Sequence, residues 1–180
     1  MTTDRKQEIL TGRINNEVLT FIESRKSLML SSIQPDGTPY ASYAPFAIGD
    51  ECFYVLLSEI ALHAVNLQHN PQASVLIIQD EDTADELFAR VRVNYSVKAE
   101  LVDLESEAWY KGIDILEARH GERIRNLSEL SDFRLFCLKP QGGRYVKGFG
   151  RAFTLAGDTL AGEAVNHMKE GHRKRADAAS

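Results

Sequence analysis

His172 and the cations that follow it are the residues of this chain with the clearest potential for chemistry. They lie in the segment 170–175, Glu-Gly-His-Arg-Lys-Arg. An imidazole is a common metal ligand and base, and neighbouring cations can pair with the carboxylates of a ligand. The same segment can instead be a solvated basic tail after a helix that ends at Gly171. His167 lies five residues earlier, outside the i, i+4 spacing of a paired helical metal site.

Asp132 is the second residue that could take part in chemistry. It stands between Ser131 and a β-prone segment at 133–138, where a turn or cap residue is common. A carboxylate can also accept a hydrogen bond from the second nitrogen of a histidine ligand, which fixes the tautomer and the basicity of the imidazole. The residues alone leave both interpretations open.

Three further residues have one structural and one functional interpretation each. Arg90 and Arg92 are two residues apart in a strand-like segment, so we expect them to share one face. That face is either solvated or, if it lines a cleft, receives an anionic ligand. His63 lies on the apolar stripe of a helical segment, which is typical of a core histidine. Gly148-Phe-Gly150 does not complete GxGxxG, and the sequence has no GxSxG, HExxH, Walker or deaminase motif.

The elements that must position these residues follow from the periodicity of the apolar side chains. Steps of three and four predict an amphipathic helix over residues 4–23. Strands at 28–33, 40–46 and 53–57 are expected to form an antiparallel meander, with a hairpin at Asp36-Gly37 between the first two. A helix from Ile60 ends at Asn70-Pro71, because the residue before proline avoids the α region.

The second half of the chain continues this mixture of strands and helices. Residues 80–86 are expected to form a loop or a short helical turn. The remaining elements are strands over 73–79, 90–102 and 153–155, a strand pair of 133–138 with 144–147 around Gly142-Gly143, and helices over 105–117 and 158–170. Six or more antiparallel strands with inserted helices predict an α+β barrel rather than a doubly wound parallel sheet.

Composition narrows the class of protein further. The chain has 180 residues, of which 43% are hydrophobic and 26% charged, as in an ordinary globular domain. Its net charge of −5 argues against general nucleic-acid binding. Cys52 and Cys137 form no CxxC motif, so neither a disulfide framework nor a structural zinc site is supported. The polar N-terminus and strand-length apolar runs predict a cytoplasmic domain without a signal peptide or a membrane span.

Several motifs together resemble a known family, and they extend over essentially the whole chain. The chain is similar to the haem-utilisation, haem-degrading proteins of the HutZ/HugZ type, within the pyridoxamine-phosphate-oxidase-like FMN-binding split-barrel superfamily. The segments that carry the resemblance are residues 42–46, 63–67, 87–92, 132–133, 146–150 and 170–174. The resemblance implies an antiparallel split β-barrel with flanking helices over residues 1–170, and a tail, 171–180, that carries a haem ligand.

The resemblance also implies roles for individual residues. His172 would be the proximal ligand of the haem iron, and Asp132 would accept a hydrogen bond from it. Arg92 would lie near the haem, within reach of a distal ligand or a propionate. His63 stands in the region where flavin-binding relatives place a basic residue near the cofactor phosphate, so it is a candidate cofactor-binding residue. A histidine there puts flavin binding in doubt, and we expect the protein to lack FMN. Arg173 and Lys174 could pair with the haem propionates.

The implied assembly is a homodimer with haem at the subunit interface. Apolar strand faces around residues 40–46 and 75–78 would be exposed in a single copy, which favours the same assembly. The function implied is that of an oxygenase that opens the porphyrin and releases iron, with O₂ and an external electron donor. Two alternatives remain: a haem carrier or storage protein without turnover, and a flavin-dependent oxidoreductase of the same fold.

Overall fold

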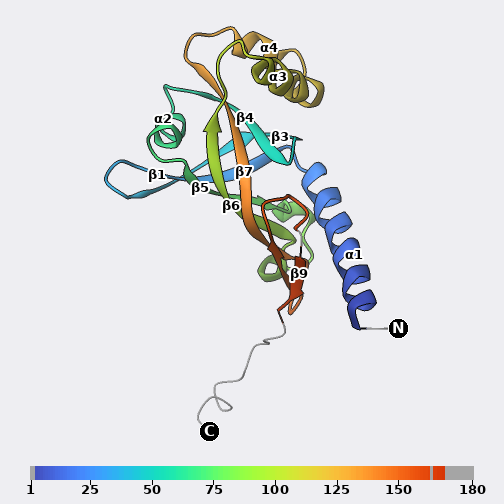
Figure 1. Ribbon diagram of the computed structural model, residues 1–180. Helices are drawn as coiled ribbons and strands as arrows, with labels where there is room; N and C mark the ends of the chain where they lie inside the picture. The colour runs from blue at the N-terminus through green and yellow to red at the C-terminus, as the bar shows by residue number, and fades with distance from the viewer. Residues whose placement is uncertain (1–2, 163, 169–180) are drawn as a thin grey trace.

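The computed structural model describes residues 3–162 and 164–168 (Figure 1). Its helices are α1 (Thr3–Glu23), α2 (Leu62–His69), α3 (Glu107–His120) and α4 (Arg123–Ser128), with short 3-10 turns η1 (Glu81–Thr83) and η2 (Leu87–Ala89). Its strands are β1 (Ser27–Ile33), β2 (Pro39–Pro45), β3 (Ala47–Gly49), β4 (Cys52–Ser58), β5 (Gln72–Ile78), β6 (Arg92–Leu101), β7 (Phe133–Val146), β8 (Ala152–Ala156) and β9 (Ala164–His167). No helix among the described residues is long and apolar enough to cross a membrane.

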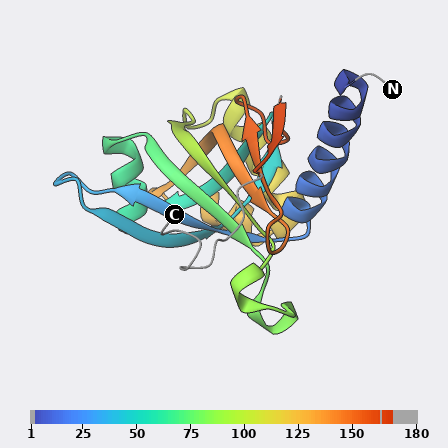
Figure 2. The ribbon, with the colours of Figure 1, turned by 90° about the horizontal axis from the view of Figure 1, so that it is seen from below.

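One antiparallel sheet organises the molecule. Its strands follow the order β2-β1-β5-β6-β7-β4-β3, and β8 and β9 extend from the last residues of β7. The sheet curves in the view from below, where α1 lies beside the β8–β9 hairpin (Figure 2). This arrangement confirms the predicted α+β split-barrel fold with flanking helices.

The main core lies between the concave face of the sheet and α1. Ile14, Val18 and Ile22 recur every four residues on α1 and are fully buried, as an amphipathic helix requires. Along β6 every second side chain is buried, from Val93 to Ala99. Tyr95 of this strand packs its ring against Phe53, 5.5 Å between centroids. Each such side chain contributes about 1.5–3 kcal/mol when fully buried, so this face fixes the register of the sheet.

A second, smaller core lies under α3. Trp109, Ile113 and Leu116 are buried on one face of this helix and pack against β4 and β7. Ser106 caps the helix, because its side chain accepts a hydrogen bond from the backbone N–H of Trp109 at 3.1 Å. Gly121 follows the helix with a φ of +86°, a backbone conformation that glycine adopts readily.

The predicted meander of the first three strands is wrong. β1 and β2 form the expected hairpin, but β4 pairs with β3 and β7, not with β2. Pro45 cannot donate to a ladder, and Phe46 turns into the core, where its ring lies 5.6 Å from that of Phe53. The chain therefore leaves one edge of the sheet and returns at the opposite edge, which closes the barrel.

The strand pair expected around Gly142-Gly143 is a single strand. β7 pairs with β6 on both sides of these glycines, and the register shifts between Tyr95 and Val97 of β6. Gly142 has a φ of +94°, and a Cβ on Gly143 would lie 2.6 Å from the Tyr95 ring. The glycines thus form a bulge and a close approach instead of a turn.

The helix predicted over residues 158–170 is also wrong. Within its described part the chain turns back and forms β9, which pairs with β8. Gly157 and Gly162 have positive φ values, which interrupt a helix and permit the return. Side chains of α1 hold this segment, because Gln7 donates to the Val165 carbonyl at 2.7 Å and Asn15 to the Gly162 carbonyl at 3.1 Å.

Candidate functional site

Two of the predicted site residues lie at opposite ends of β7. Asp132 immediately precedes the strand, in the turn after α4, whereas Arg92 pairs with Val146, the last residue of the strand. β7 has 14 residues, and at about 3.3 Å per residue its ends are roughly 40 Å apart along the strand. Figure 1 shows α3 and α4 at one end of the molecule and β9 at the other. One chain therefore does not bring Asp132 and Arg92 together.

Asp132 is held in place by two contacts with the end of β4. The Ser58 hydroxyl donates to Asp132 Oδ2 at 2.5 Å, and the Glu59 backbone N–H donates to the Asp132 carbonyl at 2.7 Å. Ser58 Oγ also accepts from the backbone N–H of Ile60 at 3.1 Å. Within the described part of the chain no donor occupies Oδ1 of Asp132, so this half-buried carboxylate can accept one further hydrogen bond.

Asp132 has both charged and apolar neighbours. Arg134 pairs with Glu59 at 3.2 Å and donates to the Ser131 carbonyl at 2.8 Å. Ile60, which binds Ser58 through its backbone, leaves 87% of its surface exposed. Leu130, two residues before Asp132, is 49% exposed. This carboxylate can therefore accept a hydrogen bond from a donor that approaches past exposed apolar side chains.

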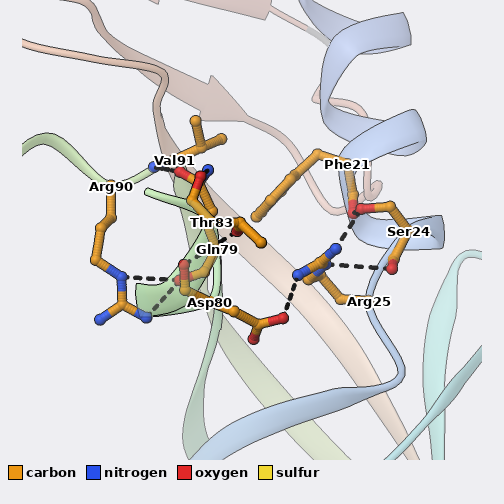
Figure 3. Close-up of polar contacts among 8 residues, drawn as sticks. All are labelled: Phe21, Ser24, Arg25, Gln79, Asp80, Thr83, Arg90 and Val91. Carbon is orange, nitrogen blue, oxygen red and sulfur yellow. Dashed lines mark hydrogen bonds and ion pairs between the residues drawn. The ribbon is translucent and has the colours of Figure 1, made fainter. Parts of the chain in front are cut away.

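Arg90 and Arg92 do not share a strand face, contrary to the prediction. Arg90 lies before β6, and its guanidinium folds back onto the Gln79 carbonyl, with Nε at 2.8 Å (Figure 3). It also pairs with Glu81 at 3.4 Å. The turn η2, which Glu86 caps, delays the start of the strand and turns Arg90 toward the end of β5.

Arg92 is the first residue of β6 and is half-buried. Its Nη1 donates to the Arg90 carbonyl at 3.0 Å. Arg90 also lines a cleft of about 380 Å³, together with Arg25 of the α1–β1 connection and residues of β1 and β5. Arg25 forms an ion pair with Asp80 at 2.8 Å, and both residues line this cleft (Figure 3). This end of the sheet thus collects cations.

The last described residues lie at the Arg92 end. The Met168 backbone N–H donates to the Ala152 carbonyl at 2.9 Å, Ala152 pairs with Val146, and Val146 pairs with Arg92. His172, Arg173 and Lys174 lie outside the described residues. Among those described, no group of three or more metal-ligating side chains is present.

His63 forms a contact with the sheet from the first turn of α2. Its Nδ1 lies 2.9 Å from the Ser42 hydroxyl, and Ser42 Oγ lies 3.4 Å from the Leu30 carbonyl. We assign the proton to Nδ1, because Ser42 then donates to the carbonyl and accepts from the imidazole. Burial lowers the pKa of His63, so the ring is neutral near pH 7. The structure thus shows a hydrogen-bonded, half-buried histidine, and cofactor binding by His63 stays a prediction.

Sequence reasoning missed Ser58 as a partner of Asp132. The sequence holds a local signal for its turn only. A serine hydroxyl that accepts from the backbone N–H two residues later is typical of a short turn between a strand and a helix. The contact with Asp132 spans 74 positions, and only the pairing of β4 with β7 creates it.

The fold and these residues define a class of protein. Residues 14–147 match the pyridoxamine 5'-phosphate oxidase family, and the chain belongs to that family. Within it, heme oxygenase HutZ of Vibrio cholerae is 46% identical over 169 residues, covering 94% of this chain and 95% of that protein. The predicted resemblance to the HutZ/HugZ type is thereby confirmed.

Solved structures agree with this assignment. A crystal structure of Vibrio cholerae HutZ, described there as a heme storage protein, is 45% identical with a TM-score of 0.71, and covers 76% of this chain and 96% of that one. Campylobacter jejuni ChuZ is 28% identical with a TM-score of 0.81, and covers 91% and 66%. A heme binding protein from Mycobacterium smegmatis, 24% identical with a TM-score of 0.73 and coverage of 82% and 60%, shares the fold.

Proposed function

We propose that this protein binds haem through His172 and opens the porphyrin as a haem-degrading oxygenase. The observation that carries the proposal is the Asp132 carboxylate, which Ser58 fixes near the exposed Ile60 with one oxygen left to accept a hydrogen bond. The relative that is 46% identical is named a heme oxygenase, which supports the same chemistry.

The separation of the two ends supports a site built from two copies of the chain. Met168 lies at the same end of the sheet as Arg92, in the row that runs through Ala152 and Val146. His172 is four residues further, and four residues span at most about 14 Å. Asp132 of the same chain is roughly 40 Å away along β7. His172 and Arg92 of one protomer can therefore meet Asp132 only if Asp132 comes from a second protomer.

The exposed face of the sheet supports a homodimer in part. Much of the apolar surface expected to be free is covered by the chain itself, because Ala44, Phe46, Val75 and Ile77 are buried in its own core. The alternate residues remain outside: Tyr43 is 65% exposed and Met29 is 52% exposed. Met29 pairs with Tyr43 and with the half-exposed Leu76, so an apolar strip crosses β2, β1 and β5. A second copy that covers this strip in a symmetric dimer creates two equivalent sites.

The residues of both ends fit haem by chemistry. A porphyrin offers two apolar faces and two carboxylates, which match the exposed Ile60 and the cations Arg92, Arg173 and Lys174. When bound, haem supplies the iron and the oxygen chemistry, with electrons from an external donor. The protein's part is to hold the iron through His172 and to orient that imidazole through Asp132, which accepts its second N–H.

Titration with hemin, followed by ascorbate in air, tests the proposal. We expect one hemin per chain and loss of the haem absorbance after ascorbate is added. Saturable binding without bleaching would support a carrier or storage protein instead, as the description of the HutZ crystal structure suggests. Stoichiometric FMN released on denaturation would favour a flavin-dependent oxidoreductase, in line with the name of the family.

A further inference from the structure

A cavity of about 800 Å³ lies between α1 and the β8–β9 hairpin. Its lining includes Lys147 and Arg151, which flank the Gly-Phe-Gly segment of the β7–β8 turn. No residue of this segment is assigned a role in the haem site proposed above, although it is one of the motifs that distinguish the sequence. Cavities of this size are typical of sites for organic ligands.

The cavity carries an excess of positive charge. Its charged lining comprises Arg13, Lys147 and Arg151 against the single carboxylate of Glu17. Glu17 already bonds Lys147 at 2.7 and 3.0 Å and lies 3.8 Å from Arg13. Among the residues that the structure describes, no carboxylate pairs with Arg151, so its guanidinium offers its donors to a ligand.

The turn before β8 positions Arg151. The Lys147 backbone N–H donates to the Arg151 carbonyl at 3.0 Å, and the Arg151 N–H donates to the Gly148 carbonyl at 3.1 Å. A Cβ on Gly148 would lie 2.8 Å from Nη2 and 3.2 Å from Nε of Arg151. The Arg151 guanidinium therefore lies over Gly148 of its own turn.

The lining of the cavity also contains an aromatic pair. Phe153 of β8 and His167 of β9 are paired residues whose rings lie 5.0 Å apart with an interplanar angle of 38°. Phe153 is buried, whereas His167 is exposed, so the imidazole is the ring of the pair that a ligand in the cavity can reach. Asn166, also in the lining and exposed, adds an amide that can donate and accept.

We propose that this cavity binds a mononucleotide, with the phosphate on Arg151 and Arg13 and the base against the Phe153–His167 pair. An arginine fork matches a phosphate in geometry and charge, and a planar base matches the aromatic pair. The site does not depend on haem, because none of its residues belongs to the proposed haem site. Arg144 provides a matched control. It is an exposed cation of β7 whose backbone is in register with Thr154 of β8, and it lies outside the cavity lining.

Calorimetric titration of the full-length, haem-free chain with AMP tests the site, with adenosine and inorganic phosphate as partial ligands. We expect one AMP per chain with a Kd of about 1 mM or lower. Each partial ligand should bind at least about tenfold more weakly, because it loses one of the two contacts. Arg151→Ala should weaken AMP binding at least about tenfold, and Arg144→Ala should change it less than about twofold.

Perturbation of the His167 ring resonances by AMP gives a second measurement at the aromatic pair. Absence of saturable AMP binding, unchanged affinity in Arg151→Ala, or equal affinity for phosphate and AMP would each overturn the proposal. Hemin that competes with AMP and binds more weakly in Arg151→Ala would overturn it as well. None of these results bears on haem bleaching, so the two proposals fail separately.

Discussion

The two ends of β7 differ in what the fold supplies. At the Asp132 end one carboxylate is fixed by side-chain and backbone hydrogen bonds and has an oxygen free to accept, with the exposed Ile60 and Leu130 nearby. At the Arg92 end the sheet gathers cations, of which Arg25 and Arg90 are paired with the exposed carboxylates Asp80 and Glu81, and the last described strand, from which the sequence continues to His172. The proposal that two copies share one site rests on this separation of the fixed carboxylate from the end that leads to the histidine.

Removal of the iron ligand should have the largest effect on this arrangement. We expect His172→Ala to abolish the histidine-ligated haem spectrum while the circular dichroism spectrum stays unchanged. His167→Ala is the matched control, because His167 is an exposed residue of β9. An unchanged haem spectrum in His172→Ala together with a lost one in His167→Ala would assign the ligand to β9.

Changes at Asp132 should affect turnover more than haem capture. The bond between iron and histidine persists without its outer partner, so in Asp132→Asn we expect affinity to fall by roughly 10–100-fold or less. Turnover depends on the orientation and electron donation of the imidazole, so ascorbate-driven haem loss should slow more strongly. Hemin affinity and bleaching rate are compared in Asp132→Asn, Asp132→Glu and the parent protein. Equal bleaching rates in all three would leave Asp132 as a turn residue only.

Ser58 should show a smaller effect of the same kind. Ser58→Ala removes the hydroxyl that donates to Asp132 Oδ2 and frees the Ile60 N–H. A typical hydrogen bond contributes about 0.5–1.5 kcal/mol, so we expect the bleaching rate to fall by a few-fold. Ser58→Thr keeps the hydroxyl and should restore most of the rate. The iron–histidine stretching frequency of hemin-loaded, reduced protein provides a readout that loss of stability alone would not shift.

His63, which lies outside both ends, should affect stability and its pH dependence only slightly. Burial lowers the pKa of His63 in the folded state, so below the ordinary value of about 6.5 the unfolded chain binds the proton more readily. The free energy of unfolding should therefore fall as the pH drops from about 6.5 through the folded-state pKa. Urea unfolding between pH 7 and pH 5 should show this slope reduced in His63→Gln and retained in His69→Gln. Equal slopes in the parent protein and His63→Gln would remove His63 as the source.

The sequence predicted those elements whose signals are local. Helix α1, the Asp36-Gly37 hairpin and the stop of α2 at Asn70-Pro71 follow from periodicity and turn chemistry. Strand β9, which forms where a helix was predicted, does not follow from local signals. Contacts with Gln7 and Asn15 of α1 override its weak local pattern. The glycines at 142 and 143 suggested a turn, but contact with Tyr95 makes them a bulge.

The site was less predictable than the fold for the same reason. The chemical type of Asp132 and Arg92 was visible in the sequence, whereas their separation depends on the length of β7 as one continuous strand. A strand pair at 133–138 and 144–147 would have folded back and brought the two residues closer together. Ser58 joins the site only through the pairing of β4 with β7, which no local signal carries.

A mixed dimer of His172→Ala and Asp132→Asn chains tests the two-copy site most directly. Two affinity tags isolate the dimer that holds one chain of each kind, and its ascorbate-driven haem loss is compared with that of the parent and of each variant. If His172 of one chain meets Asp132 of the other, one of the two sites carries both changes and the other carries neither. The account then predicts about half the parent rate, well above either variant alone. A rate no higher than that of the variants would show that both residues come from one chain and would contradict the account.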